Sequence, residues 1–310
     1  MKNYSHIITC ICCLTLTACE VEFDFNGLDD APLFLLDGNI GITTADQETG
    51  SLGMYLYAVP SAAGERTFSE DARCTLKIYI NSEPAEIKDY ITIEPFYGYI
   101  TGNYPVKPGD EILVTAESDG FPTASARTVI PQAPPVADVS CTMEGDNLKI
   151  RFSIEDNEGT DDAYAFCFRQ TVSYNVPSDN DPGSSLDLSF GNPEESSFSD
   201  TGPFDISWDD GWRYYGISDD SFSGGRREFE VTAPYKSPSG YGTPYFRIEV
   251  QRISPERLRY EIACRDKRTN LLGFIGLAPV TFAYTNVSGG SGCISSYNSG
   301  GTGWIPIPYE

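Results

Sequence analysis

The sequence predicts a mainly all-β protein with two β-sandwich-like domains, the second carrying a long loop excursion and room for one short helix. Two observations predict this class. Short runs of alternating apolar and polar residues recur along the chain, separated by Gly, Pro, Asn and Asp. About seven such runs lie between residues 32 and 130, a density typical of an immunoglobulin-like or transthyretin-like sandwich.

Residues 1–18 have the features of a lipoprotein signal peptide. Lys2 gives a positive start, residues 7–16 form a short apolar run, and small residues precede the cleavage point. The apolar run is too short and too polar to span a bilayer. The letters LTAC, residues 16–19, match the lipobox of bacterial lipoproteins, so Cys19 is the predicted lipidation site, carrying acyl chains such as palmitate. The alternative is a chance cysteine after a cysteine-rich leader.

Residues 19–31 form a predicted acidic tether. Glu20, Glu22 and Asp24 follow the anchor directly and resemble the export signal of lipoproteins that Bacteroidetes place on the cell surface. We therefore expect a lipid-anchored protein of the outer membrane that faces the cell exterior. The alternative is that an acidic protein simply has an acidic tail.

Two domains follow the tether. Residues 32–130 are the predicted sandwich, residues 131–135 (PQAPP) a stiff proline linker, and residues 136–310 a β-rich C-terminal domain. In the second domain, residues 177–212 are rich in Ser, Asp, Gly and Pro and show little periodicity. They predict a long surface excursion.

The end of the second domain leaves one choice open. Ser254, Pro255 and Glu256 form a helix-start signature, with Ser as the N-cap and Pro at the first helical position. The residues that follow also alternate, so a strand is the alternative. The Gly-rich stretch of residues 285–304 is expected to form turns and strand edges.

Charge and histidine content exclude several classes of function. The chain has 45 acidic and 21 basic residues, a net charge of −24, so nucleic acid is not an expected partner. Its one histidine, His6, lies in the leader. The mature chain therefore has no imidazole for a Ser-His-Asp or Cys-His nucleophile or for a histidine-containing metal site. We expect no enzyme activity and no cofactor.

Five cysteines follow the anchor. Cys74 begins an apolar alternation and is expected to be an inert core thiol. Disulfides among the other four are possible, and the spacing does not decide the pairing, among Cys141, Cys167, Cys264 and Cys293.

Aspartates in the excursion form a weak calcium motif. Asp179, Asp181 and Asp187 surround a glycine at spacings that a calcium loop uses, but the closing Glu is absent. A solvated acidic loop is the alternative. The DTG letters at residues 200–202 resemble an aspartic protease motif, but that chemistry needs two such carboxylates and no second copy is present.

Aromatic residues gather in the letters WDDGWRYYG, residues 208–216. Trp208, Trp212, Tyr214 and Tyr215 are the candidate ligand-binding residues, because rings beside carboxylates can stack on a sugar or peptide and accept its hydrogen bonds. The alternative is that these rings pack on the second core beneath the loop.

Several stretches resemble one family. Residues 217–231, 250–263 and 277–292, together with the end of the first domain, resemble the Bacteroidetes lipoprotein family called domain of unknown function 4249. The chain departs from the family pattern at residues 290–294 (GSGCI). The resemblance implies a surface lipoprotein, often encoded beside a TonB-dependent transporter, and it brings no catalytic residues.

These observations favour a non-enzymatic surface lipoprotein that captures a glycan or peptide ligand or assists a TonB-dependent transporter. Two alternatives remain. The first is a carboxylate-based glycan hydrolase, which needs two positioned acids and no histidine. The second is a structural role as an adhesin or fimbria-like subunit.

Overall fold

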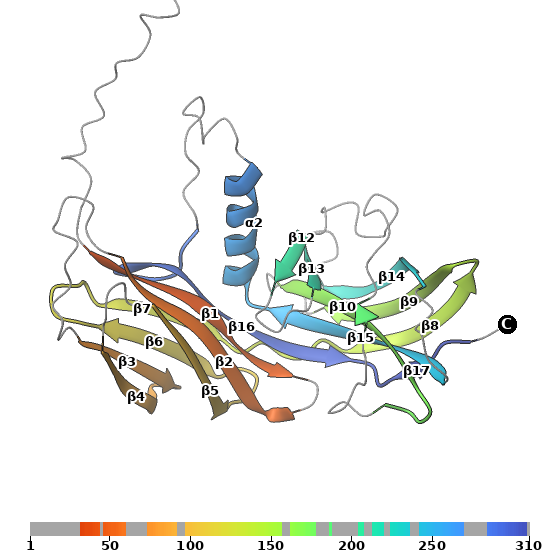
Figure 1. Cartoon of the computed structure of the whole chain (residues 1–310), viewed down its shortest axis with the longest axis horizontal. Helices are drawn as coiled ribbons and strands as arrows, with labels where there is room; N and C mark the ends of the chain where they lie inside the picture. The colour runs from red at the N-terminus through yellow and green to blue at the C-terminus, as the bar shows by residue number, and fades with distance from the viewer. Residues whose placement is uncertain are drawn as a thin grey trace, which may run out of the picture.

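The computed structural model describes most of the chain after the predicted tether. The described residues are 32–43, 46–59, 73–91, 97–156, 162–177, 186–187, 204–207, 213–219, 224–235, 242–269 and 284–308. The predicted signal peptide, the tether and Cys19 lie outside them. Most of the described chain is β-structure arranged in sandwich-like layers, which confirms the predicted fold class (Figure 1).

The strands differ widely in length, from two residues to fourteen. In chain order they are β1 (Leu33–Thr43), β2 (Asp46–Val59), β3 (Arg73–Ile80), β4 (Glu83–Ile91), β5 (Tyr97–Pro105), β6 (Glu111–Glu117), β7 (Ala124–Val129), β8 (Val136–Glu144), β9 (Asn147–Asp156), β10 (Ala163–Ser173), β11 (Leu186–Asp187), β12 (Phe204–Ser207), β13 (Arg213–Ser218), β14 (Gly225–Pro234), β15 (Thr243–Ile253), β16 (Gly290–Gly301) and β17 (Ile305–Pro306).

The described strands form three sheets, one of which runs the length of the molecule. The long sheet has ten strands in the order β12-β13-β10-β15-β16-β1-β2-β5, with β11 beside β10 and β17 beside β15. A second sheet has the order β4-β3-β6-β7, and a third has the order β14-β9-β8. Each smaller sheet packs on one end of the long sheet, so two sandwiches share it (Figure 1).

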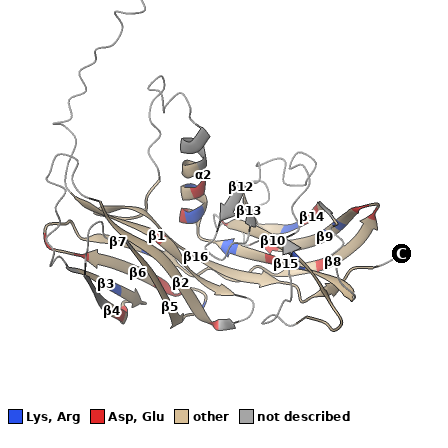
Figure 2. Cartoon of the chain, viewed as in Figure 1, with Lys and Arg blue, Asp and Glu red and all other residues tan. Residues whose placement is uncertain are grey.

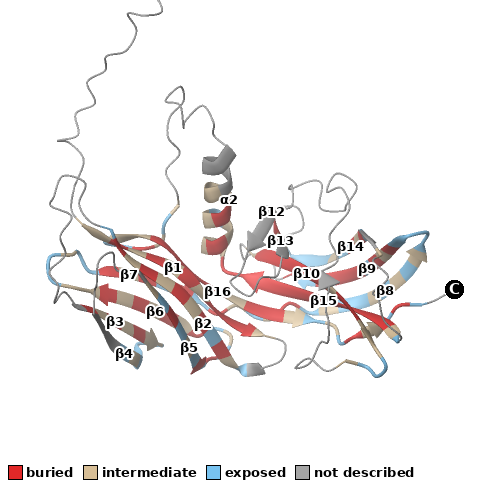
Figure 3. Ribbon diagram, viewed as in Figure 1, coloured by how far each residue is buried: buried red, intermediate tan, exposed pale blue. Residues whose placement is uncertain are grey.

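The first sandwich encloses a core built by alternation. Along β1 and β2 buried residues alternate with less buried ones, apart from the buried run 40–42, and residues such as Leu36 and Met54 have no exposed surface. The facing sheet contributes Leu76 and Val114 to the same cluster. Cys74 is also fully buried there, as its place in the β3 alternation predicts. Figure 3 shows the resulting stripes of buried residues along these strands.

The second sandwich encloses an aromatic core. Phe152 of β9 stacks on Phe229 of β14 with ring centroids 5.1 Å apart, and Phe166 of β10 packs against both rings. Strands β10 and β15 are buried along almost their whole length, since they lie inside the long sheet and are covered on both faces (Figure 3).

Strand β16 corrects the expectation for residues 285–304. Instead of forming strand edges, this stretch contributes an interior strand, between β15 and β1. Glycine makes that position possible, because a Cβ at Gly292 would lie 2.1 Å from the carbonyl oxygen of Leu36. A Cβ at Gly300 would lie 2.1 Å from the carbonyl oxygen of Pro134. Backbone segments that approach this closely leave no space for a side chain.

The shared sheet crosses the predicted domain boundary. Strand β16 belongs to the predicted domain 136–310, yet it pairs in parallel with β1 of the predicted domain 32–130. The proline segment 131–135 lies against β16, where Asn298 donates a hydrogen bond of 2.9 Å to the carbonyl oxygen of Pro131. The division into two folding units stays a prediction, and the sandwiches are joined by the hydrogen bonds of this strand.

Helix α2 (Pro255–Thr269) forms where the Ser-Pro-Glu signature predicts a start, so the alternative of a strand is wrong. It packs on the outer face of the long sheet, where Leu258 and Ile262 contact a small cluster that includes Cys167 and Ile253. The hydroxyl of Ser254 accepts a hydrogen bond of 3.2 Å from the amide of Ser296, which ties the helix start to β16. Among the described residues, no helix has the length and hydropathy that a membrane span needs.

The cysteines do not form the disulfides that the sequence left possible. None of the five cysteines of the described ranges forms a disulfide. Cys141 lies on the outer strand β8, where partial burial raises the pKa of its thiol to about 11. Cys293 is fully buried beneath α2 and contacts the carbonyl oxygen of Glu256 at 3.7 Å. The thiols that lie inside the sheets act as small apolar side chains.

Candidate ligand-binding face

Three tyrosines lie side by side on the outer face of the long sheet. The alternation of β2 buries Leu52, Met54 and Leu56 and turns Tyr55 and Tyr57 to the opposite face, the one that also carries α2. Because strand pairing places Tyr99 of β5 directly opposite Tyr55, the three rings form one group. We call Tyr55, Tyr57 and Tyr99 the tyrosine face.

The rings of the tyrosine face contact one another and remain open to solvent. The centroids of Tyr55 and Tyr99 are 4.8 Å apart with the planes tilted by 43°, and those of Tyr55 and Tyr57 are 6.1 Å apart. Tyr99 is 46% exposed, and the other two rings are half-buried. Exposed aromatic rings of this kind offer apolar area at a low cost in side-chain entropy.

Glycines beneath the rings keep this face flat. A Cβ on Gly53 of β2 would lie 2.8 Å from the hydroxyl oxygen of Tyr99, so the ring can lie over the strand only because this residue has no side chain. The same relation holds between Gly41 of β1 and Tyr297 of β16, whose ring would be 2.0 Å from an added Cβ. Rings that cover glycines also stabilise a sheet, so part of their role is structural.

Polar groups border the tyrosine face. Ser51 donates a hydrogen bond of 2.8 Å to the side-chain oxygen of Asn103, and both residues are exposed. Asn39, half-buried on β1, lies on the same face because it pairs with Gly53. A ligand with flat apolar sides and several hydroxyl groups could stack on the rings and hydrogen-bond to these groups.

A cluster of three aspartates forms the second arrangement with chemical potential. Asp156 ends β9, Asp162 precedes β10 and Asp219 follows β13, and one carboxylate oxygen of each lies within 4.8 Å of the others. These are the described residues that could hold a metal ion, since calcium takes several carboxylate oxygens.

The aspartates already accept hydrogen bonds from the protein. The amide of Gly224 donates to Asp156 at 2.8 Å, and the hydroxyl of Tyr164 donates to the same carboxylate. The amide of Asp162 donates to Asp219 at 3.0 Å. These bonds tie together the ends of four strands, so the cluster has a structural role.

Arg252 compensates part of the negative charge of the aspartates. Its guanidinium donates a hydrogen bond of 3.1 Å to the hydroxyl of Tyr164 and lies 3.6 Å from Asp162. Burial, followed by the hydrogen bond to Asp156, raises the pKa of Tyr164 well above its ordinary value. The tyrosine therefore stays protonated and donates to Asp156 at neutral pH.

The comparisons with known proteins place the chain in a family. No curated protein matches the chain. A family model, described as a domain of unknown function (DUF4249), matches residues 58–302, which is most of the chain. This chain belongs to the DUF4249 family. The family shown is the one that the strand and turn motifs resemble.

Solved structures give no further guidance on this DUF4249 protein. The yeast delta-COP-I mu-homology domain complexed with a Dsl1 WxWxV peptide has 11% identity and a TM-score of 0.26, over 90% of this chain and 98% of that one. The collagen adhesin CNA from S. aureus has 7% identity and a TM-score of 0.21, over 90% and 97%. Likenesses this weak decide neither fold nor function.

Most of the side chains that the sequence predicts as the ligand site of the DUF4249 protein lie outside the described residues. Trp208 and Trp212 lie outside the described residues, and so does the side chain of Tyr214 on β13. Tyr215 is half-buried on β13 opposite Phe166 of β10. It lies far along the sheet from the tyrosine face, which is formed by β2 and β5.

The residues of the predicted calcium site also lie mostly outside the described residues. Asp179 and Asp181 lie outside the described residues, and only the backbone of Asp187 is described, paired with Arg169. The predicted metal and aromatic sites therefore stay predictions. The tyrosine face was not predicted, although the letters MYLYA, residues 54–58, carry its signal, since two tyrosines alternate with buried residues.

Proposed function

We propose that this DUF4249 protein captures a glycan ligand on the cell surface without converting it. The single observation that carries the proposal is the tyrosine face, three contacting rings on an open sheet with amide and hydroxyl groups at its border. Sugar rings present apolar faces for stacking and hydroxyl groups for hydrogen bonding, and this combination of groups suits both.

The cellular setting of the proposed function is the outer surface of the outer membrane. The lipobox at residues 16–19 supports a lipid anchor at Cys19, and the acidic tether supports export to the surface. Work as an accessory of a TonB-dependent transporter rests on what the family resemblance implies. A lipid anchor would favour such a partnership, because it confines the protein to the membrane that holds the transporter and raises the effective concentration.

The experiment that tests ligand capture is a glycan array probed with the purified mature protein and with Tyr99→Ala and Tyr55→Ala. We expect binding to a defined set of glycans to fall at least about tenfold in both variants, which is the loss of one stacking contact. Tyr174→Ala is the matched control, because Tyr174 is 79% exposed and lies in the other sandwich. Equal binding by all three variants would rule out the tyrosine face as the ligand site.

The anchor is tested separately in cells. Cells fed an alkyne fatty acid should label the wild-type chain, whereas Cys19→Ala should remain unlabelled and leave the membrane fraction. Digestion by protease added to intact cells would support surface exposure. Labelling of the Cys19→Ala variant would exclude this cysteine as the anchor.

The alternative is a carboxylate-based glycan hydrolase, favoured by the closeness of Asp156, Asp162 and Asp219. Such an enzyme uses one carboxyl group as an acid and a second as a nucleophile or base. A purified protein that hydrolyses an array-positive glycan, with turnover lost in Asp219→Asn, would establish the alternative. Binding without turnover, unchanged in Asp219→Asn, supports capture.

A further inference from the structure

Among the described strands, β5 forms one edge of the long sheet. Among the described strands, β2 pairs with one side of β5 and no strand pairs with the other. Its nine residues, YGYITGNYP, contain no charged side chain, although 21% of the whole chain is charged. An edge strand of this length exposes a row of backbone donors and acceptors that another strand can use.

The other described edges carry the protection that β5 lacks. Strands β4 and β5 each contain a proline, but β4 also has Glu, Lys and Asp side chains, and β14 has two arginines and two glutamates. Strand β8 has a bulge at Asp138, where φ is 51°, and β12 has only four residues. Strand β7 is covered, since Ser125 exchanges two backbone hydrogen bonds with Ser288. Figure 2 shows charged residues along the arm of β8, β9 and β14.

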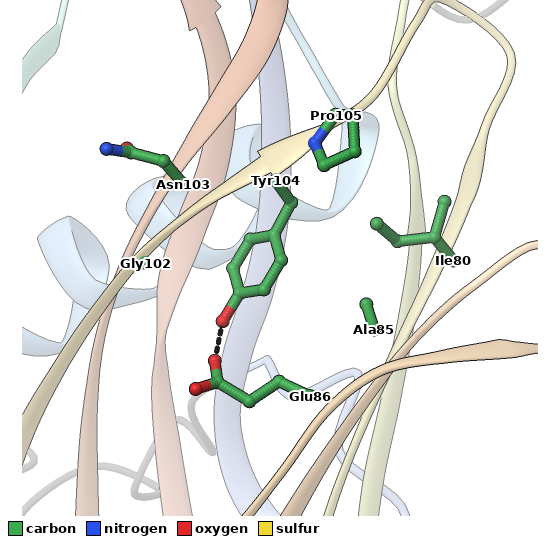
Figure 4. A pocket seen from close by; sticks show the side chains of 7 residues that line it. All are labelled: Ile80, Ala85, Glu86, Gly102, Asn103, Tyr104 and Pro105. Carbon is green, nitrogen blue, oxygen red and sulfur yellow. Dashed lines mark hydrogen bonds between the residues drawn. The ribbon is translucent and has the colours of Figure 1, made fainter.

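A pocket opens between β5 and the edge strand of the facing sheet. It has a volume of about 430 Å³, and it is lined by Ile80, Ala85, Glu86, Gly102, Asn103, Tyr104 and Pro105 (Figure 4). Its lining mixes apolar and polar groups, and Glu86 is the charged member. The hydroxyl of Tyr104 donates a hydrogen bond to Glu86, which holds the carboxylate in the lining of the pocket.

We propose that β5 docks an extended segment of another protein, which adds a strand to the long sheet and inserts a basic side chain into the pocket beside Glu86. Successive side chains of an added strand point to opposite faces of the sheet. One set would lie beside Tyr99 on the outer face, and the other set would enter the gap between the sheets, where the pocket lies. Backbone hydrogen bonds supply affinity and the pocket supplies selectivity.

Charge decides between a foreign segment and a second copy of the chain. The pocket presents a carboxylate, and the whole chain carries a net charge of −24, so a second copy meets strong repulsion whereas a basic segment is attracted. Strand β5 itself contains no Lys or Arg that could reach Glu86 of a partner copy. The partner chemistry that fits is therefore a basic extended peptide.

The test uses the mature chain and two labelled probe peptides of alternating threonine and valine, one with a central lysine and one with a central glutamate. We expect the lysine peptide to bind at least about tenfold more tightly, and the amides of β5 to exchange hydrogen more slowly in its presence. Glu86→Gln should remove most of that preference. The control is Glu83→Gln, which should leave the preference unchanged, because Glu83 is an exposed acid on β4, the strand that also carries Glu86.

Two further variants separate edge pairing from simple charge attraction. Thr101 is exposed in β5. Both Thr101→Lys and Thr101→Glu should weaken binding of the lysine peptide, because each places a charge at the docking edge. If Thr101→Glu instead strengthens binding, the peptide is held by charge alone and the proposal fails. Thr232, an exposed threonine of the edge strand β14, provides matched controls in Thr232→Lys and Thr232→Glu, which should change nothing.

Other outcomes overturn the proposal as well. Absence of lysine-peptide binding by a chain with native circular dichroism would exclude docking at β5. A sedimentation mass of two copies that Thr101→Lys returns to one copy would show that β5 pairs with itself. The test does not depend on glycan capture, since Tyr99→Ala should lose glycans while keeping the backbone edge that the peptide needs.

Discussion

Tyr260 of α2 donates a hydrogen bond of 3.2 Å to Asp37 of β1, a residue 223 positions earlier in the chain. The guanidinium of Arg257 lies 3.6 Å from the same carboxylate and 2.5 Å from Glu261. This group of side chains fixes the helix on the outer face of the sheet, close to the tyrosine face. The helix therefore ties the last fifth of the chain to β1, the strand that pairs with β2 of the tyrosine face.

Tyr260→Phe should lower the free energy of unfolding by about 1–2 kcal/mol, because it removes a hydrogen bond to a charged acceptor. Urea denaturation followed by circular dichroism measures the change. Tyr174→Phe is the control, since Tyr174 is 79% exposed, and it should have no effect. Equal stabilities of Tyr260→Phe and wild type would show that the bond to Asp37 contributes nothing.

Gly41→Ala should lower the free energy of unfolding by about 1–3 kcal/mol, because the new methyl group must displace the ring of Tyr297. In a Tyr297→Ala background the same change should cost much less, since the overlap is gone. A double-mutant cycle of unfolding free energies gives the coupling between the two positions. Additive effects would mean that the ring does not limit the space at Gly41.

Arg252→Gln should destabilise the protein by about 3 kcal/mol, because it leaves the largely buried Asp162 and the buried Asp156 and Asp219 with less compensation. Arg226→Gln is the matched control. Arg226 forms an ion pair with Asp138 in which both side chains are about half exposed, and exposed pairs contribute little. If the two variants have the same unfolding midpoint, the assigned role of Arg252 is contradicted.

The buried thiol of Cys293 should make the folded protein less stable at alkaline pH. Burial is the main cause that raises the pKa of its thiol from 9.0 to about 12. Above pH 9 the unfolded chain loses this proton while the folded chain keeps it, so the contribution is complete below pH 9 and is lost as the pH rises towards 12. Cys293→Ala should flatten the decline of the unfolding free energy by about 1.4 kcal/mol per pH unit in this window.

The measurement for Cys293 is urea denaturation at intervals between pH 9 and pH 11. Tyrosines that also titrate in this range are the same in both proteins, so the difference between the two curves isolates the thiol. Parallel curves would show that Cys293 ionises at an ordinary pKa and is not buried in solution. Cys141→Ala should flatten the curve only up to pH 11, where its own raised pKa lies.

The local patterns of the sequence predicted the β class and many of its strands, and they offered the helix start at Ser254 beside the alternative of a strand. Cys74, Leu76 and Ile78 alternate, and all three are buried, because the side chains of a strand point to opposite faces whatever its neighbours are. Ser254 and Pro255 start the helix for an equally local reason, since proline suits the first turn. The family followed from similar short motifs.

Only the tertiary structure decided which strands meet. The Gly-rich stretch that predicted strand edges became β16, parallel to β1 in the middle of the sheet, and the contact of Tyr55 with Tyr99 needed the register of β2 on β5. The aspartates at positions 156, 162 and 219 meet where four strands end. Strand partners are chosen by hydrogen bonds and packing summed over distant segments, whereas the alternation that identifies a strand is present in its own few residues.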